Sequence, residues 1–239
     1  MTRSVLLNNL DHRDLRVITT RGARYGDNVM LAITFPAEFR NLQAYYPIVL
    51  RKTSQGQFEP VALLGFQERQ NLFLDKDGWN ATYLPLTIER LPFLIGIADA
   101  QPMIHVDLDS PRISRIEGEP LFREHGGNTD FLERMNSVLL AIHQGIAGTA
   151  PFIAALLEHE LLESFVFDIQ LADGSQNRLA GFYTINEERL GGLQGAVLDR
   201  LHRAGHLQAI YMIVASLSNF RALIERMNKL HAGNPQQSP

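Results

Sequence analysis

The segment His105-Val106-Asp107 is the pattern in this sequence that comes closest to a redox metal site. In non-haem iron oxygenases, a His-x-Asp pair on a strand supplies two protein ligands and leaves positions open for oxygen and a cosubstrate. Residues two apart on a strand point to the same face, so the spacing of His105 and Asp107 is suitable. The site also needs a distal histidine on another strand, and no histidine has an obvious strand setting. A strand end that enters a polar turn is the favoured interpretation.

A second pattern, HELLE from His159 to Glu163, is close to the His-Glu-x-x-His helix of zinc proteases. Glu163 replaces the second histidine, and a solvated helical face explains the segment as well. His202 and His206 are four residues apart, but Gly205 predicts a helix break between them. We therefore expect no metal and no other cofactor, and the pair His105 and Asp107 is kept only as an alternative metal site.

The turn around the only tryptophan, Asp77-Gly78-Trp79-Asn80, favours recognition. Tryptophan combines a large apolar area with one N–H donor, and exposed aromatic residues often anchor partners. The competing interpretation is that Trp79 folds back onto the sheet. Arg90 lies between two apolar segments, where it would reach an anionic ligand or pair with a carboxylate. The predicted binding residues are therefore Asp77, Trp79, Asn80 and Arg90.

Motifs that identify an enzyme reaction are missing from the sequence. It has no G-x-S-x-G elbow, no phosphate-binding loop and no dinucleotide fingerprint. It has no cysteine, which excludes disulfides, thiolate catalysis and cysteine-ligated metal centres. The paired acids Glu187 and Glu188 fall in the first turn of an expected helix, where the helix dipole explains them. A non-catalytic role is therefore favoured, although an enzyme is left open.

The elements that must position these residues divide between the two halves of the chain. Apolar runs separated by polar turns and prolines predict strands in the first half, in a bent and covered sheet. The expected strands are 29–35, 46–51, 61–66, 71–74, 83–88, 93–98 and 103–108.

Helical spacing dominates the second half. It predicts helices at 130–146, 150–163, 187–203 and 219–230, a hairpin of strands 165–171 and 179–185, and a last strand at 208–216.

The expected fold is α+β, with a bent mixed β-sheet in the first half and helices from the second half packed on it. We expect the last strand to join that sheet or the hairpin. We predict a single domain over 1–230, with a possible subdomain division near 118–128, and a flexible tail at 231–239.

Composition narrows the class of partner. The chain has 239 residues, is 45% hydrophobic and carries a formal net charge of -4. Its basic residues form no cluster in the sequence, which disfavours nucleic acid. The N-terminus lacks the apolar core of a secretory signal, and no uninterrupted apolar run approaches the length of about 18–20 residues that crosses a bilayer. We expect a soluble, cytoplasmic protein without a membrane span.

An ordered series of segments carries a family resemblance. The series reads YPIVL, PVALLGF, NLFLD with the tryptophan turn, RLPFLIGI, GEPLF, GFYTINEERL and HLQAIYMIVASLSNF. Together these segments extend from about residue 5 to residue 230 and resemble the bacterial SapC-like family. The family takes its name from a gene associated with surface-layer proteins and is distinct from the membrane permease of the same name.

The resemblance implies an accessory role. Members are often encoded beside flavin-dependent halogenase-like proteins, cupin-type hydroxylases and TonB-dependent receptors. We therefore expect a soluble, non-catalytic accessory protein that recognises a protein or peptide in a modification or uptake pathway. Its partner would be a flavin-dependent halogenase-like protein or a TonB-dependent receptor. The alternative function is a metal-dependent oxygenase of the non-haem iron type that uses His105 and Asp107.

Overall fold

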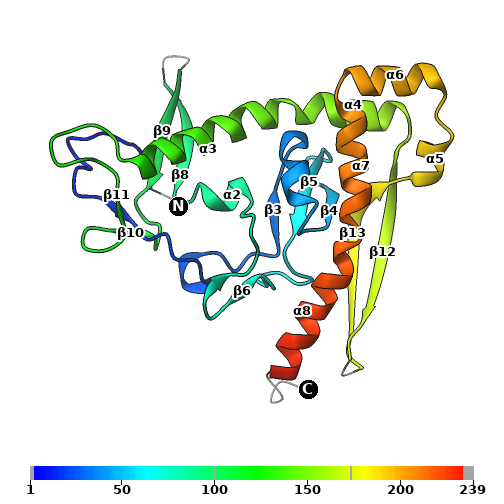
Figure 1. The fold of residues 1–239 in the computed structure, drawn as a ribbon, viewed down its shortest axis with the longest axis horizontal. Coiled ribbons are helices and arrows are strands. Elements are labelled where there is room, and N and C mark those ends of the chain that lie inside the picture. The colour runs from blue at the N-terminus through cyan, green and yellow to red at the C-terminus, as the bar shows by residue number, and fades with distance from the viewer. Residues whose placement is uncertain (1–2, 99–100, 173, 234–239) are drawn as a thin grey trace. The chain divides into compact units, whose positions relative to one another are not determined.

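The computed structural model describes residues 3–98, 101–172 and 174–233, and it confirms the α+β class (Figure 1). The chain divides into two compact units and passes between them several times. Unit 1 comprises Met1–Asn28, Leu74–Trp79 and Leu86–Gln144, and unit 2 comprises Val29–Phe73, Asn80–Pro85 and Gly145–Pro239. Residues 118–128 lie within unit 1. That the two units fold together as a single domain stays a prediction.

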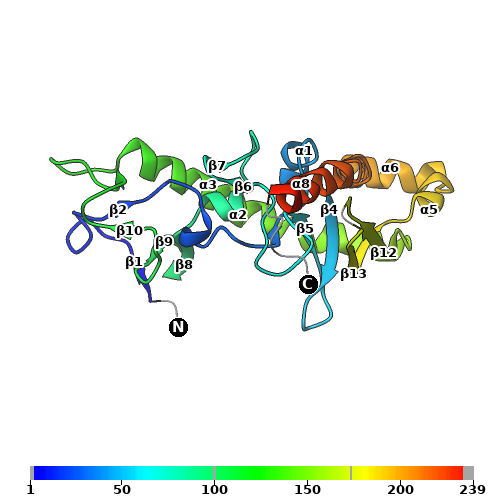
Figure 2. The same cartoon turned by 90° about the horizontal axis from the view of Figure 1, so that it is seen from below.

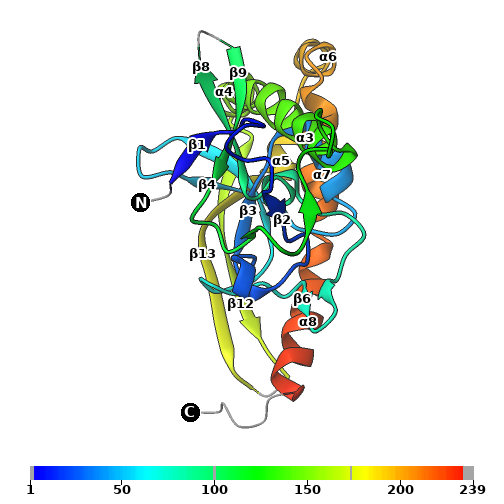
Figure 3. The ribbon, with the colours of Figure 1, turned by 90° about the vertical axis from the view of Figure 1, so that its left-hand side faces the viewer.

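Unit 1 contains three small antiparallel sheets, in the orders β1-β9-β8, β10-β2-β11 and β6-β7. Figure 3 shows β1 alongside the β8–β9 hairpin. The elements are β1 Ser4–Leu6, β2 Arg16–Val17, η1 Ala23–Tyr25, β6 Leu74–Asp75, β7 Gly78–Trp79, α2 Leu86–Glu89, β8 Phe93–Ala98, β9 Gln101–Asp107, β10 Ile113–Ser114, β11 Glu119–Pro120 and α3 Asp130–Ala147, whose last turn belongs to unit 2.

The helix expected at 130–146 is confirmed as α3. Thr129 caps it, because the Leu132 amide donates to Thr129 Oγ1 over 3.3 Å. Asp130 and Glu133 lie in the first turn, where the helix dipole favours acidic side chains. One face of α3 is buried, and its residues repeat at helical spacing: Leu132, Met135, Val138, Leu139 and Ile142.

A buried ion pair joins the segments of unit 1. Asp27 and Arg112 are 0% and 1% exposed, and Arg112 Nη2 lies 2.5 Å from Asp27 Oδ2. Arg112 Nη1 also donates to the carbonyls of Ile18 and Thr20. Arg21 approaches Asp27 Oδ1 at 3.4 Å. Burial lowers the pKa of Arg21 below its usual value, the Arg112 charge lowers it further, and Asp27 opposes both effects.

Unit 2 is built on one antiparallel sheet in the order β12-β13-β4-β5-β3 (Figure 2). Figure 3 shows α8 ending beside the far end of the β12–β13 hairpin, where Asn228 accepts a hydrogen bond from the Ala172 amide. The elements are β3 Leu31–Ile33, η2 Pro36–Glu38, α1 Phe39–Leu42, β4 Ile48–Lys52, β5 Phe58–Leu63, α4 Thr149–Glu158, β12 Leu162–Gln170, β13 Gln176–Ile185, α5 Glu187–Gly191, α6 Gly195–Arg203, α7 His206–Ser216 and α8 Asn219–Gly233.

The segment expected as a last strand, 208–216, is a helix, α7, so that prediction is wrong. Gly205, with φ 73°, turns the chain between α6 and α7. Ile210 and Ile213 are fully buried on the inner face of α7. Ser216 fixes the helix to the sheet, because its hydroxyl accepts from the Ile48 amide over 2.8 Å and donates to the Ile213 carbonyl.

Four further element predictions need correction. Of the strand expected at 71–74, only Leu74 lies in a strand, β6. Residues 83–88 contain the short helix α2 instead of a strand. Helix α4 ends at Glu158 instead of 163, because Glu160 takes a left-handed φ of 53° and stops the helix. The helix expected at 187–203 is divided into α5 and α6.

The expected sheet also differs in composition and direction. Every strand pairing in the described residues is antiparallel, so the sheet is not mixed. The predicted hairpin of the second half is confirmed as β12–β13, and it extends the sheet of β3, β4 and β5. Of the expected tail, 231–233 belong to α8, and 234–239 lie outside the described residues.

Two helical stretches, 130–158 and 206–232, are long and apolar enough by length and composition to cross a membrane. The prediction that the chain has no membrane span rested on uninterrupted apolar runs alone, whereas these two stretches contain scattered polar residues. Both stretches also supply core residues, such as Ile142 and Ile213, and a helix that packs into a core is apolar for that reason. The absence of a membrane span stays a prediction.

We expect Asp27→Asn to lower the free energy of unfolding by about 3–5 kcal/mol, because it leaves the Arg112 charge buried and uncompensated. Asp130→Asn is the matched control, since the Arg123–Asp130 pair has side chains 61% and 97% exposed. The control should lose less than about 1 kcal/mol. Urea denaturation followed by the fluorescence of Trp79, which lies in unit 1, measures both. Equal losses for the two variants would contradict the structural role of Asp27.

Candidate functional site

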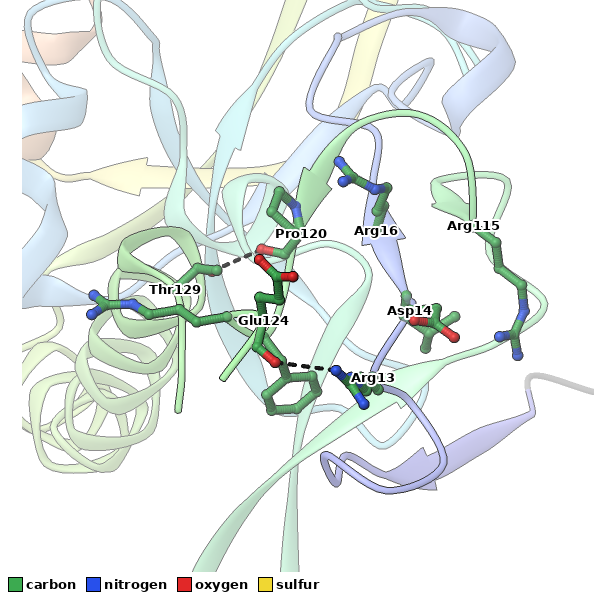
Figure 4. Close-up of a pocket in the computed structure, with 10 residues that line it drawn as sticks. Arg13, Asp14, Arg16, Arg115, Pro120, Glu124 and Thr129 are labelled. Carbon is green, nitrogen blue, oxygen red and sulfur yellow. Dashed lines mark hydrogen bonds between the residues drawn. The ribbon is translucent and has the colours of Figure 1, made fainter. Parts of the chain in front are cut away.

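An arginine-lined pocket of about 690 Å³ lies in unit 1 (Figure 4). Its walls come from the segment around β2 and from the segment that runs from β10 to the start of α3. It is lined by Arg13, Asp14, Leu15, Arg16, Arg115, Pro120, Phe122, Arg123, Glu124 and Thr129. We call it the arginine pocket below.

The three-stranded sheet β10-β2-β11 brings the arginines together. Arg16 in the central strand is paired with Ser114 of β10 on one side and with Pro120 of β11 on the other. Arg115 directly follows β10, so the register places it next to the strand that carries Arg16. Two segments about 100 residues apart in the sequence therefore supply one site.

Gly118 permits the tight connection between β10 and β11. Its φ is 99°, and a Cβ at this position would lie 2.4 Å from the Val17 carbonyl oxygen. A side chain would collide with the central strand, so only glycine fits this turn. The Gly118 carbonyl accepts from Arg16 Nη1 over 2.8 Å, which holds the guanidinium of Arg16 at the pocket.

Backbone carbonyls, not carboxylates, hold Arg13 and Arg16. Arg13 Nη2 donates to the Glu124 carbonyl over 3.1 Å, and Thr129 Oγ1 donates to the Pro120 carbonyl over 2.7 Å; both bonds are drawn in Figure 4. Arg115 makes no hydrogen bond or ion pair with any residue that the structure describes. Within the described residues, three of the four arginines thus have no acidic side chain as an ion-pair partner.

The pocket is positive although the chain as a whole is negative. Four arginines line it against two acidic residues, Asp14 and Glu124. The fourth arginine, Arg123, pairs with Asp130 at 2.8 Å, and both side chains are largely exposed. An exposed pair of this kind is worth about 0–1 kcal/mol, so an incoming anion displaces Asp130 at little cost. The site is suited to bind carboxylates or other oxyanions.

The predicted binding residues Asp77, Trp79 and Asn80 differ in burial and in their hydrogen-bond partners. Trp79 lies in β7, paired with Leu74, and is half-buried. Asp77 is exposed in the turn, where its amide donates to Asp75 Oδ1. Asn80 belongs to unit 2, where its carbonyl accepts from Arg226 Nη2 over 2.9 Å. A recognition role for these residues stays a prediction.

Arg90 is half-buried at the end of α2. Its Nη1 donates to the Phe93 carbonyl over 2.6 Å. Among the described residues, no carboxylate lies within ion-pair distance of it. Burial lowers the pKa of Arg90 below its usual value. The binding of an anion by Arg90 stays a prediction.

His105 and Asp107 share one face of β9, as expected, but each has another role. The imidazole of His105 covers Gly96, where an added Cβ would lie 2.3 Å from Nε2, and its Nδ1 lies 3.4 Å from the Ser4 hydroxyl. Asp107 Oδ1 accepts from the Asp109 amide in a turn. The described residues contain no group of three metal-ligating side chains. The alternative metal site therefore stays a prediction that lacks a third ligand.

The two other histidine patterns are not arranged for metal binding. The segment from His159 to Glu163 leaves the helix at Glu158 and enters β12 at Leu162, so His159 and Glu163 are not one helical turn apart. His202 lies in α6 and His206 in α7, separated by the break at Gly205 that the sequence predicted.

We expect Trp79→Ala to lower the free energy of unfolding by about 1–3 kcal/mol, less than the 3–5 kcal/mol typical of a fully buried tryptophan, because Trp79 is half-buried. Trp79→Phe is the control and should lose less, since it keeps an aromatic ring at the same place. Thermal and urea unfolding followed by circular dichroism measure the difference. A loss below about 0.5 kcal/mol for Trp79→Ala would show that the side chain contributes nothing to packing.

Comparison with known proteins gives one finding on identity. No curated protein and no solved structure matches the chain. The model of the SapC family matches residues 7–223, which is most of the 239-residue chain, including all of β2, β10 and β11. This match agrees with the ordered segments from YPIVL to HLQAIYMIVASLSNF, and the chain belongs to the SapC family.

Proposed function

We propose that this protein is a non-catalytic accessory protein that binds an acidic segment of a protein partner through the arginine pocket. The observation that carries the proposal is the convergence of Arg13, Arg16, Arg115 and Arg123 on one pocket with only two acidic lining residues. The non-catalytic part rests on the sequence, which lacks the nucleophile, phosphate-binding and dinucleotide motifs sought above.

Carboxylates of a peptide fit the pocket better than a single small anion. Arg13, Arg115 and Arg123 are exposed, and one exposed ion pair is worth about 0–1 kcal/mol. A segment with several carboxylates engages several arginines at once, so the later contacts form at a high effective concentration. The planar guanidinium binds each carboxylate through two parallel hydrogen bonds, which adds specificity.

Charge also favours an acidic peptide over nucleic acid. The chain carries a formal net charge of -4, so its long-range field repels a long polyanion. A nucleic-acid surface needs a positive stripe that follows many phosphates. A local positive pocket on a negative protein suits a short acidic segment instead.

The partners implied by family resemblance are candidates for this pocket. They are a flavin-dependent halogenase-like protein and a TonB-dependent receptor. We propose that the partner carries an acidic loop or terminus that enters the arginine pocket, and that recognition works in a modification or uptake pathway.

The test uses a fluorescein-labelled peptide of eight glutamates and fluorescence anisotropy on the full chain. We expect Arg115→Glu to weaken binding about 5- to 10-fold, which corresponds to about 1–1.4 kcal/mol, because it replaces an unpaired attractive charge by a repulsive one. Arg40→Glu is the matched control, since Arg40 is an exposed arginine of α1 in unit 2 and causes the same change of net charge. The affinity should also fall as salt rises from about 0.05 to 0.3 M.

Two results would contradict the proposal. One is an equal loss of affinity for Arg115→Glu and Arg40→Glu, which would show a general effect of net charge. The other is tighter binding of a thymidine octanucleotide than of the glutamate peptide at 0.15 M salt, which would identify a nucleic-acid surface. Retained far-ultraviolet circular dichroism in both variants confirms that the fold is intact.

A further inference from the structure

A second pocket, of about 600 Å³, lies in unit 2 between the β12–β13 hairpin and the junction of α7 and α8. It is lined by Phe165 and Phe167 of β12, Thr184 of β13, Leu217 and Ser218 between the helices, and Phe220 and Arg221 of α8. We call it the phenylalanine pocket. Its volume lies within the range of about 300–1,000 Å³ that is usual for small-molecule sites.

Three aromatic rings form the apolar wall. The ring centre of Phe220 lies 4.8 Å from that of Phe167 and 6.1 Å from that of Phe165. The strand pairing of β12 is irregular between Phe165 and Phe167, yet both rings contact Phe220, while Val166 between them is 50% exposed. The strand therefore turns its aromatic residues towards α8, where they offer ring faces and edges to an apolar ligand.

Thr184 adds an unsatisfied polar group to this wall. The residue is only 7% exposed, and its Oγ1 is buried without a hydrogen-bond partner among the described residues. A buried hydroxyl without a partner is destabilising, since it has lost water and gained nothing. A ligand group that reaches Thr184 would supply the missing partner.

Arg221 is the charged residue of the lining. Its guanidinium is in no hydrogen bond or ion pair with the described residues. The residue is exposed. The Ser218 hydroxyl, the third polar side chain of the lining, already donates to the Ala215 carbonyl over 2.9 Å. The Thr184 hydroxyl and the Arg221 guanidinium are donors without a partner among the described residues, and an anionic acceptor satisfies both.

We propose that the phenylalanine pocket binds a small carboxylic acid with an apolar body. The body packs against Phe165, Phe167 and Phe220, and the carboxylate accepts hydrogen bonds from Thr184 and Arg221. The inference concerns unit 2 and does not depend on the arginine pocket of unit 1.

The test measures binding of two acids to the full chain by isothermal titration calorimetry. The probes are naphthaleneacetate, with an aromatic body, and octanoate, with an alkyl body. Their uncharged counterparts, naphthaleneethanol and octanol, are the matched ligands. We expect at least one acid to bind about 5-fold or more tightly than its alcohol, since only the acid carries the charge that Arg221 attracts.

Two variants probe the donors. Thr184→Val keeps the shape of the side chain and should weaken binding of the acid about 5-fold without lowering the unfolding temperature, because it removes an unsatisfied hydroxyl. Thr149→Val is its matched control: Thr149 Oγ1 is also buried without a partner among the described residues, but it lies in α4 and does not line the pocket. Arg221→Gln should weaken acid binding by a similar factor, and Lys229→Gln, also on α8, should not.

Four results would overturn the inference. The first is the absence of heat for both acids up to about 10 mM, which means that the pocket takes no such ligand. The second is equal affinity of each acid and its own alcohol, which would remove the role of the charge. Equal effects of Thr184→Val and Thr149→Val on acid binding would show that Thr184 has no contact with the ligand. A dimer in sedimentation that Phe167→Ser dissociates would instead identify a second copy of the chain as the occupant.

Discussion

The buried pair of Asp27 and Arg112 is the interaction on which the arginine pocket depends. Arg112 immediately precedes β10, and its guanidinium binds Asp27 and the carbonyls of Ile18 and Thr20, which directly follow β2. The Ile18 amide in turn donates to the Arg112 carbonyl over 2.9 Å. Two strands of two residues each have few ladder hydrogen bonds of their own, so these bonds fix their register. The positions of the pocket arginines Arg16 and Arg115 therefore depend on that register.

Local patterns in the sequence predicted the elements whose faces differ in polarity. The face of α3 that contains Leu132 and Ile142 repeats at helical spacing, and the apolar runs at 165–171 and 179–185 predicted the two strands of the β12–β13 hairpin. The sequence pattern gave the wrong element where a short run has few polar residues. The run IYMIVAS in α7 is rich in residues that favour strands, and its length fits either a strand or a helix. Packing decided the outcome, since Ile210, Ile213 and Ser216 all face the sheet at helical spacing.

The arginine pocket could not be predicted from charge along the chain. Its arginines are at most two to a segment, Arg13 with Arg16 and Arg115 with Arg123, and neither pair stands out among 22 basic residues. Only the pairing of β2 with β10 and β11 joins them. One signal was present in the sequence, the pattern Arg13-x-x-Arg16, whose second arginine lies in β2. Trp79 is the opposite case. Its residue type suggested a binding role from the sequence alone, but in the structure it lies half-buried in the β6–β7 hairpin.

Three buried polar atoms have no hydrogen-bond partner in the described part of the chain, and the surroundings of each atom offset this loss to a different degree. They are Arg112 Nε, Thr149 Oγ1 and Thr184 Oγ1, and each costs about 1–3 kcal/mol. The other nitrogens of Arg112 make the bonds that order unit 1, which offsets the loss at Nε. Thr184 has no such compensation among the described residues, and valine, of the same shape and with a stronger preference for strands, would fit β13 better. Stability alone therefore does not explain a threonine at this position, whereas a ligand that accepts its hydrogen bond does.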